Sequence, residues 1–554
     1  MFRFASVVTR SVLFGSLLAV LPLAAQTSST AIRLSAAASD PGKPLVHFWS
    51  KVVGAGRANE GLRSTWQEQL ATSHREAGFN YVRFHGLFHD DMMVYREDEQ
   101  GRPIYNFQYI DDLFDRMLDQ GVRPFVELGF MPGDLATKKN TTMWWQANGC
   151  PPKDYDKWAA LVRVSVQHWE QRYGADEVRR WYFEVWNEPN LKGFWAGDQQ
   201  QYYALYKITA VTIKQVDPAL KVGGPATSNY DIDEDVLKAA QAAAKASGKP
   251  IDPLSLPWTP IWVEDFLNWA KQNNLPVDFV STHPYPSWFG LPGVKPTENH
   301  LYRSVNAIRD DLTTLRKIVD ESPYPKAEIH LTEWNTSWEI FDYTHDALSA
   351  AAFVVKSNLD SIGLVDSLSY WTFTDVFEEN RKTESPFHGC FGMINYQQIP
   401  KPVFHAYRMM NQLGDRLLAQ TDGAIVTRDA AMGRVTAMAW NNPPERKTTV
   451  PVTPTVEAAL AFDATGSARD LDLHLTGLTP GATFELETLD RTHGNVLPVW
   501  DAMGRPDSLT RPQTETLRAV AAATAKEILH ADAQGQFELH RPIASWSVVL
   551  LRQF

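Results

Sequence analysis

Cysteine is scarce in this sequence, because only Cys150 and Cys390 occur among 554 residues. Two cysteines exclude a scaffold held together by a disulfide framework, which needs several bridges. A single bridge stays open, because both cysteines lie in segments rich in glycine and proline, and bridging depends on how close their Cα atoms come. The fold must therefore rest mainly on a hydrophobic core, and a content of 44% hydrophobic residues can supply one.

An excess of positive charge is also missing, since 53 Lys and Arg residues face 65 Asp and Glu, for a net charge of −12. This balance argues against nucleic acids and anionic membrane surfaces as partners. Long apolar runs are absent after the N-terminus. There, Arg3 and Arg10 accompany a short apolar run over residues 11–23, with Leu23-Ala24-Ala25 before Gln26. We expect residues 1–25 to be a signal peptide for an exported protein, periplasmic or secreted and free of the membrane after signal removal; the alternative is a retained N-terminal anchor.

Several catalytic motifs are missing as well. The histidines are dispersed, and the HExxH spacing of many zinc hydrolases does not occur. The GxSxG elbow of serine hydrolases is absent. Gly54-Ala-Gly56 is only a weak echo of a phosphate-binding loop, because no helix start follows it. We therefore expect no metal and no cofactor.

What the sequence does contain is a regular alternation of strand-like and helix-like runs. Such alternation implies parallel strands with helices outside, and eight units over this length predict a (β/α)8 TIM barrel at 45–410. An open doubly wound sheet is the competing architecture. The expected strands are 46–52, 81–87, 124–130, 181–188, 221–225, 278–285, 328–334 and 367–373, and the expected helices include 62–77, 109–120, 155–173, 200–216, 261–273, 301–320 and 346–362.

Residues 411–554 have a different character, with short alternating runs separated by Pro and Gly turns. This pattern predicts a β-sandwich, interrupted by one helix at about 514–528. Strands are expected at 435–440, 471–475, 484–487 and 546–551. Residues 26–44 are rich in Ser and Ala and are expected to be a lead-in segment with one peripheral strand at 32–34.

The stretch Trp181-Tyr-Phe-Glu-Val-Trp-Asn-Glu-Pro-Asn190 looks like a buried strand with a polar tip. Side chains alternate along a strand, so Phe183 and Val185 should face a covering layer while Glu184 and Glu188 face the interior. Pro189 ends the ladder because it has no N–H to donate. Glu188 is thus expected at the carboxyl end of a barrel strand, where such barrels place their chemistry.

A second carboxylate, Glu333, ends another predicted strand. Its parity is shared with the apolar Ile329 and Leu331, so simple alternation would point it outward unless the strand bends or bulges at Thr332. Two carboxyl groups in an aromatic cleft suit glycoside hydrolysis, in which one donates a proton and the other is ionised. Other polar or aromatic residues at strand ends are His85, Asn187, His283, Tyr285 and Trp371.

At these residues the chain resembles glycoside hydrolase family 39, and most closely its bacterial β-xylosidase branch. The resemblance runs through most of the chain after residue 45. It departs mildly at Cys390, where family members often have Gly, and at Pro284, where Ala is common. It is carried by Phe84-His-Gly-Leu87, Arg123-Pro-Phe-Val-Glu-Leu-Gly-Phe-Met-Pro132, Trp186-Asn-Glu-Pro-Asn-Leu-Lys192, His330-Leu-Thr-Glu-Trp-Asn-Thr-Ser337, Tyr370-Trp-Thr-Phe-Thr-Asp-Val-Phe-Glu-Glu379, His493-Gly-Asn495 and Met503-Gly-Arg-Pro506.

The resemblance implies a retaining mechanism with Glu188 as acid/base and Glu333 as nucleophile. It also implies that Asn187 holds the sugar 2-hydroxyl and that Tyr285 hydrogen-bonds the nucleophile. The sugar pocket would be shaped by His85, His283, Trp371, Glu378 and Glu379.

The leading hypothesis is an exo-glycosidase that removes terminal β-1,4-linked D-xylose from plant cell-wall oligosaccharides. Release of L-arabinose units is the main alternative, since the two pockets can differ by a few loop residues. An α-L-iduronidase would need a basic cluster, and only Lys192 follows Glu188 closely. From another class, a catalytically inactive sugar-binding barrel would turn over no aryl glycoside. The oligomeric state is left open.

Overall fold

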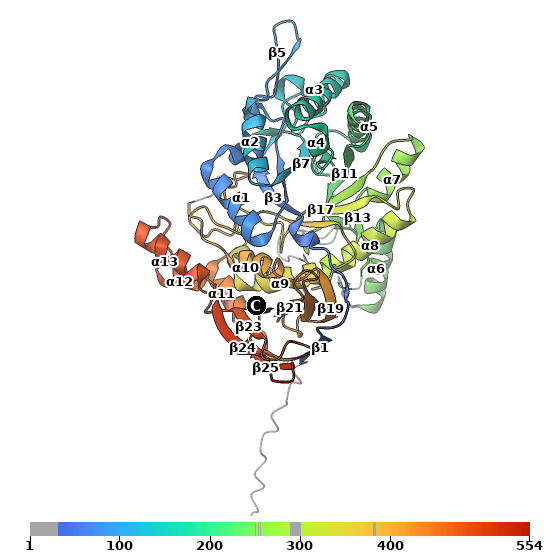
Figure 1. Ribbon diagram of the computed structural model, residues 1–554. Helices are drawn as coiled ribbons and strands as arrows, with labels where there is room; N and C mark the ends of the chain where they lie inside the picture. Colours follow the sequence, from blue (N-terminus) through green and yellow to red (C-terminus); the bar gives the residue numbers. More distant parts are fainter. Residues whose placement is uncertain (1–30, 250, 253, 255, 289–300, 381–383) are drawn as a thin grey trace, which may run out of the picture.

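The computed structural model describes residues 31–249, 251–252, 254, 256–288, 301–380 and 384–554. The predicted export signal therefore lies outside the described residues. Eight parallel strands form a closed barrel in the order β3-β4-β7-β10-β11-β14-β17-β18, with helices around it, as predicted (Figure 1). The open doubly wound sheet is thereby excluded.

The barrel strands and their outer helices alternate along the chain. Short hairpins and two extra helices occupy the loops between them. The strands are β3 (Val52–Arg57), β4 (Tyr81–His85), β7 (Arg123–Leu128), β10 (Tyr182–Val185), β11 (Lys221–Ser228), β14 (Phe279–His283), β17 (Glu328–Trp334) and β18 (Ser367–Tyr370). The helices are α1 (Ser64–Ala77), α2 (Gln108–Asp119), α3 (Tyr155–Tyr173), α5 (Gln199–Val216), α7 (Val263–Gln272), α8 (Ala307–Glu321), α9 (Leu348–Leu359) and α10 (Pro402–Met410). The loop elements are β5 (Tyr95–Glu97), β6 (Pro103–Tyr105), β8 (Thr141–Thr142), β9 (Ala147–Asn148), α4 (Ala175–Val178), β12 (Tyr230–Asp231), α6 (Glu234–Ser247), β13 (Thr259–Pro260), β15 (Ser287–Trp288) and β16 (Leu301–Tyr302).

The inside of the barrel is filled in layers by alternate residues of its strands. Near the amino ends of the strands, Phe125, Tyr182 and Phe279 form one buried aromatic cluster. Below it, Glu328 is within 3.0 Å of Lys51 and 2.5 Å of Lys221. Packed side chains therefore fill the barrel at the amino ends of its strands. The opposite end, at the carboxyl ends of the strands, remains for polar functional groups.

The second unit consists of two sheets packed face to face. Buried residues from both sheets, such as Val426, Leu473 and Phe484, form one core between them. The larger sheet has the order β2-β19-β20-β21-β26-β23-β24 and the smaller the order β1-β22-β25. Their strands are β1 (Ile32–Ala37), β2 (Lys43–Pro44), β19 (Arg416–Thr421), β20 (Ala424–Arg428), β21 (Val435–Trp440), β22 (Arg469–Thr476), β23 (Thr483–Leu489), β24 (Ala525–His530), β25 (Phe537–Ile543) and β26 (Val548–Gln553), with helices α11 (Val456–Asp463), α12 (Leu497–Ala502) and α13 (Arg511–Ala522).

Several predicted boundaries are wrong. The helix expected at 301–320 begins only at Ala307, because Leu301–Tyr302 form β16 and pair with β15. The first barrel strand was expected at 46–52, but β3 spans Val52–Arg57 and residues Phe48–Ser50 form a 3₁₀ turn. A Cβ atom at Gly54 would lie 2.4 Å from the Trp371 ring, and one at Gly56 would lie 2.5 Å from Glu60. Only glycine leaves room for these neighbouring side chains. The segment is therefore a strand, although its glycine content gives it a low strand propensity.

The helix expected at 514–528 is also displaced, because α13 ends at Ala522 and residues 525–528 belong to β24. Pairing with β23 along its full length outweighs the helical preference of this Ala- and Lys-containing stretch. The peripheral strand expected at 32–34 is part of β1, which pairs in parallel with β22 of the sandwich. The segment that precedes the barrel in sequence thus belongs to the other unit in space.

Helices α9 and α10 lie between the barrel strands and the sandwich (Figure 1). Asp463 of α11 accepts hydrogen bonds from the backbone N–H groups of Leu348 and Ser349, at 2.9 Å each, and so caps the start of α9. Arg408 of α10 contacts Glu487 of β23 at 2.5 Å. Polar contacts of defined geometry therefore join the two units.

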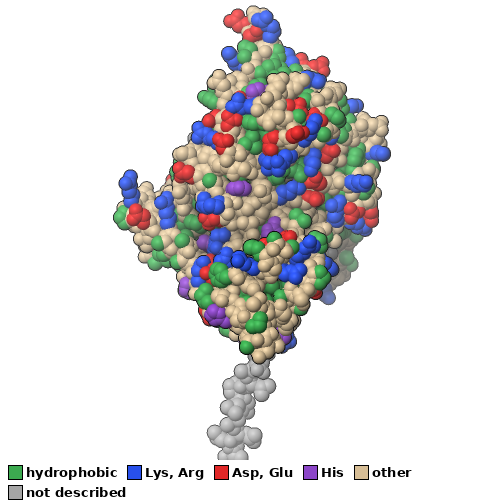
Figure 2. Space-filling model, in the orientation of Figure 1, with side chains coloured by type: hydrophobic (Ala, Val, Ile, Leu, Met, Phe, Trp, Pro, Cys, Tyr) green, Lys and Arg blue, Asp and Glu red, His purple; other side chains and the backbone are tan. Residues whose placement is uncertain are grey.

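The surface is mixed in charge (Figure 2), and both cysteines are buried. On the face shown in Figure 2, basic and acidic side chains are interspersed over the barrel and the sandwich. Cys150 and Cys390 are both buried free thiols, so the bridge left open by the sequence does not form. Within the described ranges, none of the helices combines the length and the apolar character needed to cross a membrane.

Candidate active site

A cavity of about 260 Å³ opens at the carboxyl ends of the barrel strands. The residues that line it all lie between positions 85 and 391, so the sandwich supplies none of them. They are His85, Asn187, Glu188, Leu191, Phe194, Ser228, Asn229, Tyr285, Glu333, Trp338, Trp371, Glu379 and Phe391. Seven of these residues were singled out from the sequence, and the structure brings them to one place.

Glu188 is positioned by the loop that follows β10. The strand ends at Val185, and both Trp186 and Glu188 have positive φ angles, of 75° and 45°. The unusual backbone is held by a 2.8 Å hydrogen bond from the Glu188 N–H to the Ala226 carbonyl. Asn190 adds two hydrogen bonds of 2.9 Å to the backbone of Ser228. The loop is thereby fastened to the end of β11, and its strained residues sit where functional sites often store strain.

Glu333 faces the cavity because β17 bulges, as the sequence suggested. The register of β17 against β18 shifts between Leu331 and Trp334. Two consecutive side chains consequently point inward, since Thr332 hydrogen-bonds Glu184 at 2.8 Å and Glu333 hydrogen-bonds Arg83 at 2.5 Å. Tyr285 donates a further hydrogen bond of 3.2 Å to the other oxygen of Glu333.

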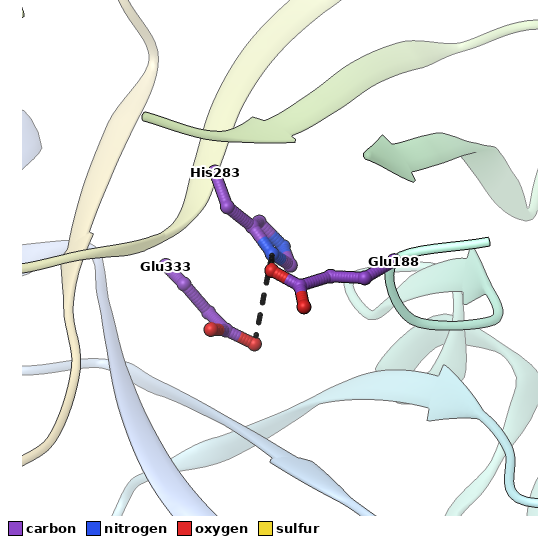
Figure 3. A group of neighbouring side chains, drawn as sticks. All are labelled: Glu188, His283 and Glu333. Atoms are coloured by element: carbon purple, nitrogen blue, oxygen red, sulfur yellow. Dashed lines mark hydrogen bonds and ion pairs between the residues drawn. The ribbon is translucent and has the colours of Figure 1, made fainter. Parts of the chain in front are cut away.

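Glu188, Glu333 and His283 come together across the cavity (Figure 3). One ligand-type atom from each residue lies within 4.8 Å of the others. His283 Nδ1 is 2.9 Å from Glu188 Oε1 and 3.7 Å from Glu333 Oε1. Such a trio can also suit a metal ion, but here the Arg83 guanidinium already contacts Glu333 at 2.5 Å and would repel a cation. The trio is better suited to proton transfer and nucleophilic attack.

Arg83 is the charge around which the cavity floor is organised, and sequence reasoning missed it. Its side chain is fully buried and donates to Glu184 at 2.7 Å, to Glu333 at 2.5 Å and to Asn187 at 2.7 Å. It also lies 3.1 Å from Glu127. Burial lowers the pKa of Arg83, but the surrounding carboxylates raise it above its ordinary value, so it is permanently charged.

The electrostatics separate the two carboxyl groups of the central pair. Burial raises the pKa of Glu188 to about 7, although Ser228, His85 and Arg83 act against this shift. Glu333 instead accepts hydrogen bonds from both Arg83 and Tyr285, and such donors stabilise a carboxylate. Glu188 can therefore hold a proton near neutral pH, while the oxygens of Glu333 are each occupied by a hydrogen-bond donor.

Two further titratable groups flank the pair. Burial lowers the pKa of His85, but Glu127, 2.6 Å from its Nδ1, outweighs burial and raises that pKa to about 9. Burial raises the pKa of Glu379 to about 8, although about a fifth (22%) of its side chain remains exposed to the cavity. His85 Nε2 is 3.6 Å from both Glu333 and Glu379.

The remaining residues singled out from the sequence lie as follows. Trp371 stacks at an angle against His85 with ring centroids 4.8 Å apart, and its edge lies against Gly54. The side-chain oxygen of Asn187 accepts a hydrogen bond from Arg83. Its side-chain nitrogen has no hydrogen-bond partner among the described residues. Glu378 is not part of the cavity wall, because Arg57 and Arg63 hold its carboxylate at 2.7 and 2.6 Å.

Comparison with known proteins bears on this geometry. The family model for glycosyl hydrolases family 39 matches residues 31–538. The chain belongs to this family. It is 36% identical over 478 residues to a β-xylosidase from Geobacillus stearothermophilus, covering 85% of each chain.

Two solved family structures are also similar to this family 39 chain. The family 39 enzyme from Xanthomonas axonopodis pv. citri has a TM-score of 0.82 and 32% identity, covering 96% of this chain and 99% of that one. A monomeric β-xylosidase from Caulobacter crescentus CB15 has a TM-score of 0.80 and 31% identity, covering 94% and 99%. The protein is therefore a glycoside hydrolase.

Besides Arg83, sequence reasoning missed Glu127 and the role of Thr332 in this hydrolase. Both lie on inward-facing positions of barrel strands, where Glu127 contacts His85 and Thr332 contacts His283. A signal was present for Arg83, which shares its parity with His85 in the otherwise apolar strand β4. A charged residue that alternates with a catalytic candidate is a reasonable search target in any barrel strand.

Proposed function

We propose that this family 39 enzyme is a retaining exo-β-xylosidase that removes terminal D-xylose from xylo-oligosaccharides by double displacement. The observation that carries the proposal is the separation of the two central carboxyl groups. Oxygens of Glu188 and Glu333 lie within 4.8 Å of each other. Retaining glycosidases need about 5–5.5 Å between the carboxyl groups, whereas inverting ones leave about 6.5–9.5 Å for a water molecule.

The environments of the pair support distinct roles. Glu188, with a pKa raised to about 7, would donate its proton to the glycosidic oxygen. Glu333, held by Arg83 and Tyr285, would attack the anomeric carbon and form the glycosyl-enzyme. Glu188 would then take a proton from water for the second step.

The cavity favours one neutral sugar ring. Its volume of about 260 Å³ is below the usual ~300–1,000 Å³ of ligand pockets, which suits an enzyme acting on chain ends. Among the described residues lining it there is no Lys or Arg, so an acidic sugar would lack a fixed cationic partner apart from protonated His85. The amide nitrogen of Asn187 is available to a hydroxyl, while His85, Trp371 and Glu379 shape the wall. The relatives' names, β-xylosidase, agree with this substrate.

The test is azide rescue with an activated aryl β-xyloside. Glu188→Ala should still form the glycosyl-enzyme, because a good leaving group needs little protonation, but should stall at the second step. Azide needs no deprotonation, so it should restore turnover and give the β-xylosyl azide. Glu333→Ala should lose activity on every substrate without azide, and any azide product should be α. Product configuration is read by NMR.

Glu321→Ala, an exposed position at the end of α8, serves as the control and should behave as wild type. An α-azide from Glu188→Ala together with a β-azide from Glu333→Ala would exchange the two roles. Faster hydrolysis of an aryl α-L-arabinofuranoside than of the β-xyloside would replace the proposed sugar. No turnover of any aryl glycoside would favour a sugar-binding barrel.

A further inference from the structure

A chain of four buried hydrogen bonds leads away from Glu188 beneath the cavity. His283 lies 2.9 Å from Glu188 Oε1 through Nδ1, and 3.0 Å from Thr332 Oγ1 through Nε2. Thr332 donates to Glu184 Oε1 at 2.8 Å, and Arg83 donates to Glu184 Oε2 at 2.7 Å. Each residue of this chain, here called the relay, is at most 6% exposed.

The direction of each hydrogen bond in the relay follows from Arg83, the residue at the end farthest from Glu188. Arg83 can only donate, so Glu184 accepts from it. Glu184 also accepts the single hydroxyl proton of Thr332, through Oε1. Thr332 has then spent its donor and can offer only lone pairs to His283. The Nε2 atom of His283 must therefore carry the proton.

The other ring nitrogen is fixed by the same logic. Burial lowers the pKa of His283 to about 4, so the ring is neutral near neutral pH and carries one proton. With that proton on Nε2, Nδ1 has only a lone pair. The 2.9 Å contact with Glu188 is a hydrogen bond only if Glu188 donates it, that is, only if Glu188 is protonated.

We propose that Thr332 and Glu184 are positioning residues that lock His283 in its Nε2–H tautomer and so keep the proton on Glu188 until the leaving group takes it. This inference rests on the proposed function in one respect, namely that Glu188 is the acid/base. The tautomer itself is a property of the resting protein.

The relay also affects the second half of the reaction. In the first step the Glu188 proton moves to the glycosidic oxygen, the bond from C1 to that oxygen breaks, and a Glu333 oxygen bonds to C1. Glu188 is then a carboxylate that faces the bare Nδ1 lone pair, which cannot stabilise its charge. This repulsion makes Glu188 a stronger base toward water. Water bonds to C1, the bond from C1 to Glu333 breaks, and the proton returns to Glu188, while His283 keeps its own proton throughout.

Other titratable groups face Glu188 and His283, and a variant that tests the relay must leave them unchanged. From the neighbouring strands and loops these are Arg83, His85, Glu127, Glu333, Tyr285 and Glu379. Thr332→Val changes none of them and keeps the side-chain shape, but it removes the acceptor for Nε2–H. Thr332→Ser keeps the hydroxyl and is the matched control.

In Thr332→Val we expect His283 to move its proton to Nδ1 and donate to the Glu188 carboxylate. This contact lowers the pKa of Glu188, so the alkaline limb of kcat/KM against pH should shift to lower pH by about one unit. Hydrolysis of xylobiose at pH 7 should fall about fivefold, because a Glu188 pKa lowered from about 7 by about one unit leaves roughly a tenth of the molecules protonated instead of about half. The first step on an activated aryl xyloside should change less than threefold. Thr332→Ser should follow wild type in all three measurements.

Glu184→Gln tests the direction of the chain without relying on turnover. Arg83 needs the Gln oxygen, so the amide NH2 must face Thr332, whose hydroxyl then donates to Nε2 and reverses the tautomer. The tautomer is read by ¹⁵N NMR of histidine-labelled protein, with His283 assigned by loss of its signal in His283→Gln. Wild type and Thr332→Ser should show Nε2–H, and Glu184→Gln should show Nδ1–H.

Nδ1–H in the wild type would overturn the proposal, as would a Thr332→Val variant with an unshifted alkaline limb and wild-type hydrolysis of xylobiose. If Thr332→Val does not fold, the NMR comparison of wild type, Thr332→Ser and Glu184→Gln decides the tautomer. If the wild type hydrolyses no β-xyloside, the proposed function fails, and the NMR result still judges the relay.

Discussion

At the scale of residues, the cavity holds more acidic groups than its cations can neutralise. Glu127, Glu184, Glu188, Glu333 and Glu379 surround two cations, Arg83 and the His85 imidazolium. Burial raises the pKa of Glu188 to about 7 and that of Glu379 to about 8. The protons that limit the excess negative charge are thus held by two groups that line the cavity, which makes both of them hydrogen-bond donors at mildly acid pH.

Substitutions of Glu379 test whether this group is protonated in the cavity. Because its pKa is raised to about 8, it is protonated at pH 6, and Glu379→Gln then replaces one neutral donor by another. We expect kcat/KM at pH 6 to stay within about threefold of wild type. Glu379→Ala should lose about tenfold, equivalent to one hydrogen bond of about 1–1.5 kcal/mol. Above pH 8 wild type should decline more steeply than Glu379→Gln. Equal losses in both variants at pH 6 would show that Glu379 acts as an anion.

The sequence predicted which residues stand at strand ends, but not which partners they meet. His85, Asn187, Glu188, Tyr285 and Glu333 could be placed together because carboxyl ends of barrel strands converge. Arg83 was missed, because its importance lies in contacts with four residues on or just after three other strands, and these contacts depend on strand register. Glu378 was expected in the pocket, yet Arg57 and Arg63, from a different part of the chain, hold it away from the cavity wall.

At the scale of elements, the strand-end loops are supported by a buried lysine. Lys401, just before α10, lies 2.7 Å from Asp346 and 2.8 Å from Asp375, and donates to the Cys390 carbonyl at 2.9 Å. These partners come from the loops after β17 and β18 and from the segment carrying Phe391, which lines the cavity. One side chain therefore fastens three segments behind the cavity wall.

Lys401→Met should be strongly destabilising, because it leaves two buried carboxylates without a cation. Breaking a buried ion pair from one side costs about 3–5 kcal/mol. We expect a loss of this size in the free energy of unfolding, measured by urea denaturation. Lys317→Met, at an exposed position on α8, should change it by no more than about 0.5 kcal/mol. A Lys401→Met loss below about 1 kcal/mol would show that the lysine does not support these loops.

Element types followed from periodicity far better than element boundaries did. The strand at 435–440 was placed correctly. All six of its residues are buried, and successive ones belong to different cores, with Ala437 and Ala439 in the sandwich core and Met438 in the barrel core. β3 was misplaced, since the space beside Gly54 is filled by the ring of Trp371, which is distant in sequence. The bulge at Thr332 could be suspected from the parity conflict at Glu333, but its presence depends on pairing with β18.

At the scale of the whole molecule, the first and last described strands, β1 and β26, lie in the same unit. β1 and β2 precede the barrel in sequence, yet each pairs with a strand that follows it, β22 and β19 respectively. Asp463 caps α9 from the sandwich side, and Arg408 of α10 contacts Glu487. Segments from before and after the barrel thus pair with each other in the sandwich. The sandwich supplies no residue to the cavity wall.

This arrangement predicts that damage to β1 lowers stability and spares catalysis. Ile32 and Leu34 are 1% and 8% exposed and pack in the sandwich core, whereas the Arg33 side chain between them is 78% exposed. Truncating buried Ile or Leu to Ala costs about 2–5 kcal/mol per site, so Ile32→Ala with Leu34→Ala should lower the Tm by roughly 5–10 °C or more. At 25 °C kcat/KM should be unchanged, because no sandwich residue reaches the cavity. Arg33→Ala should leave both the Tm and kcat/KM near wild type.

Calorimetry and steady-state kinetics on the same samples separate the outcomes. Activity lost while the protein remains folded would mean that the sandwich shapes the catalytic cavity. An unchanged Tm would mean that β1 is dispensable to the sandwich.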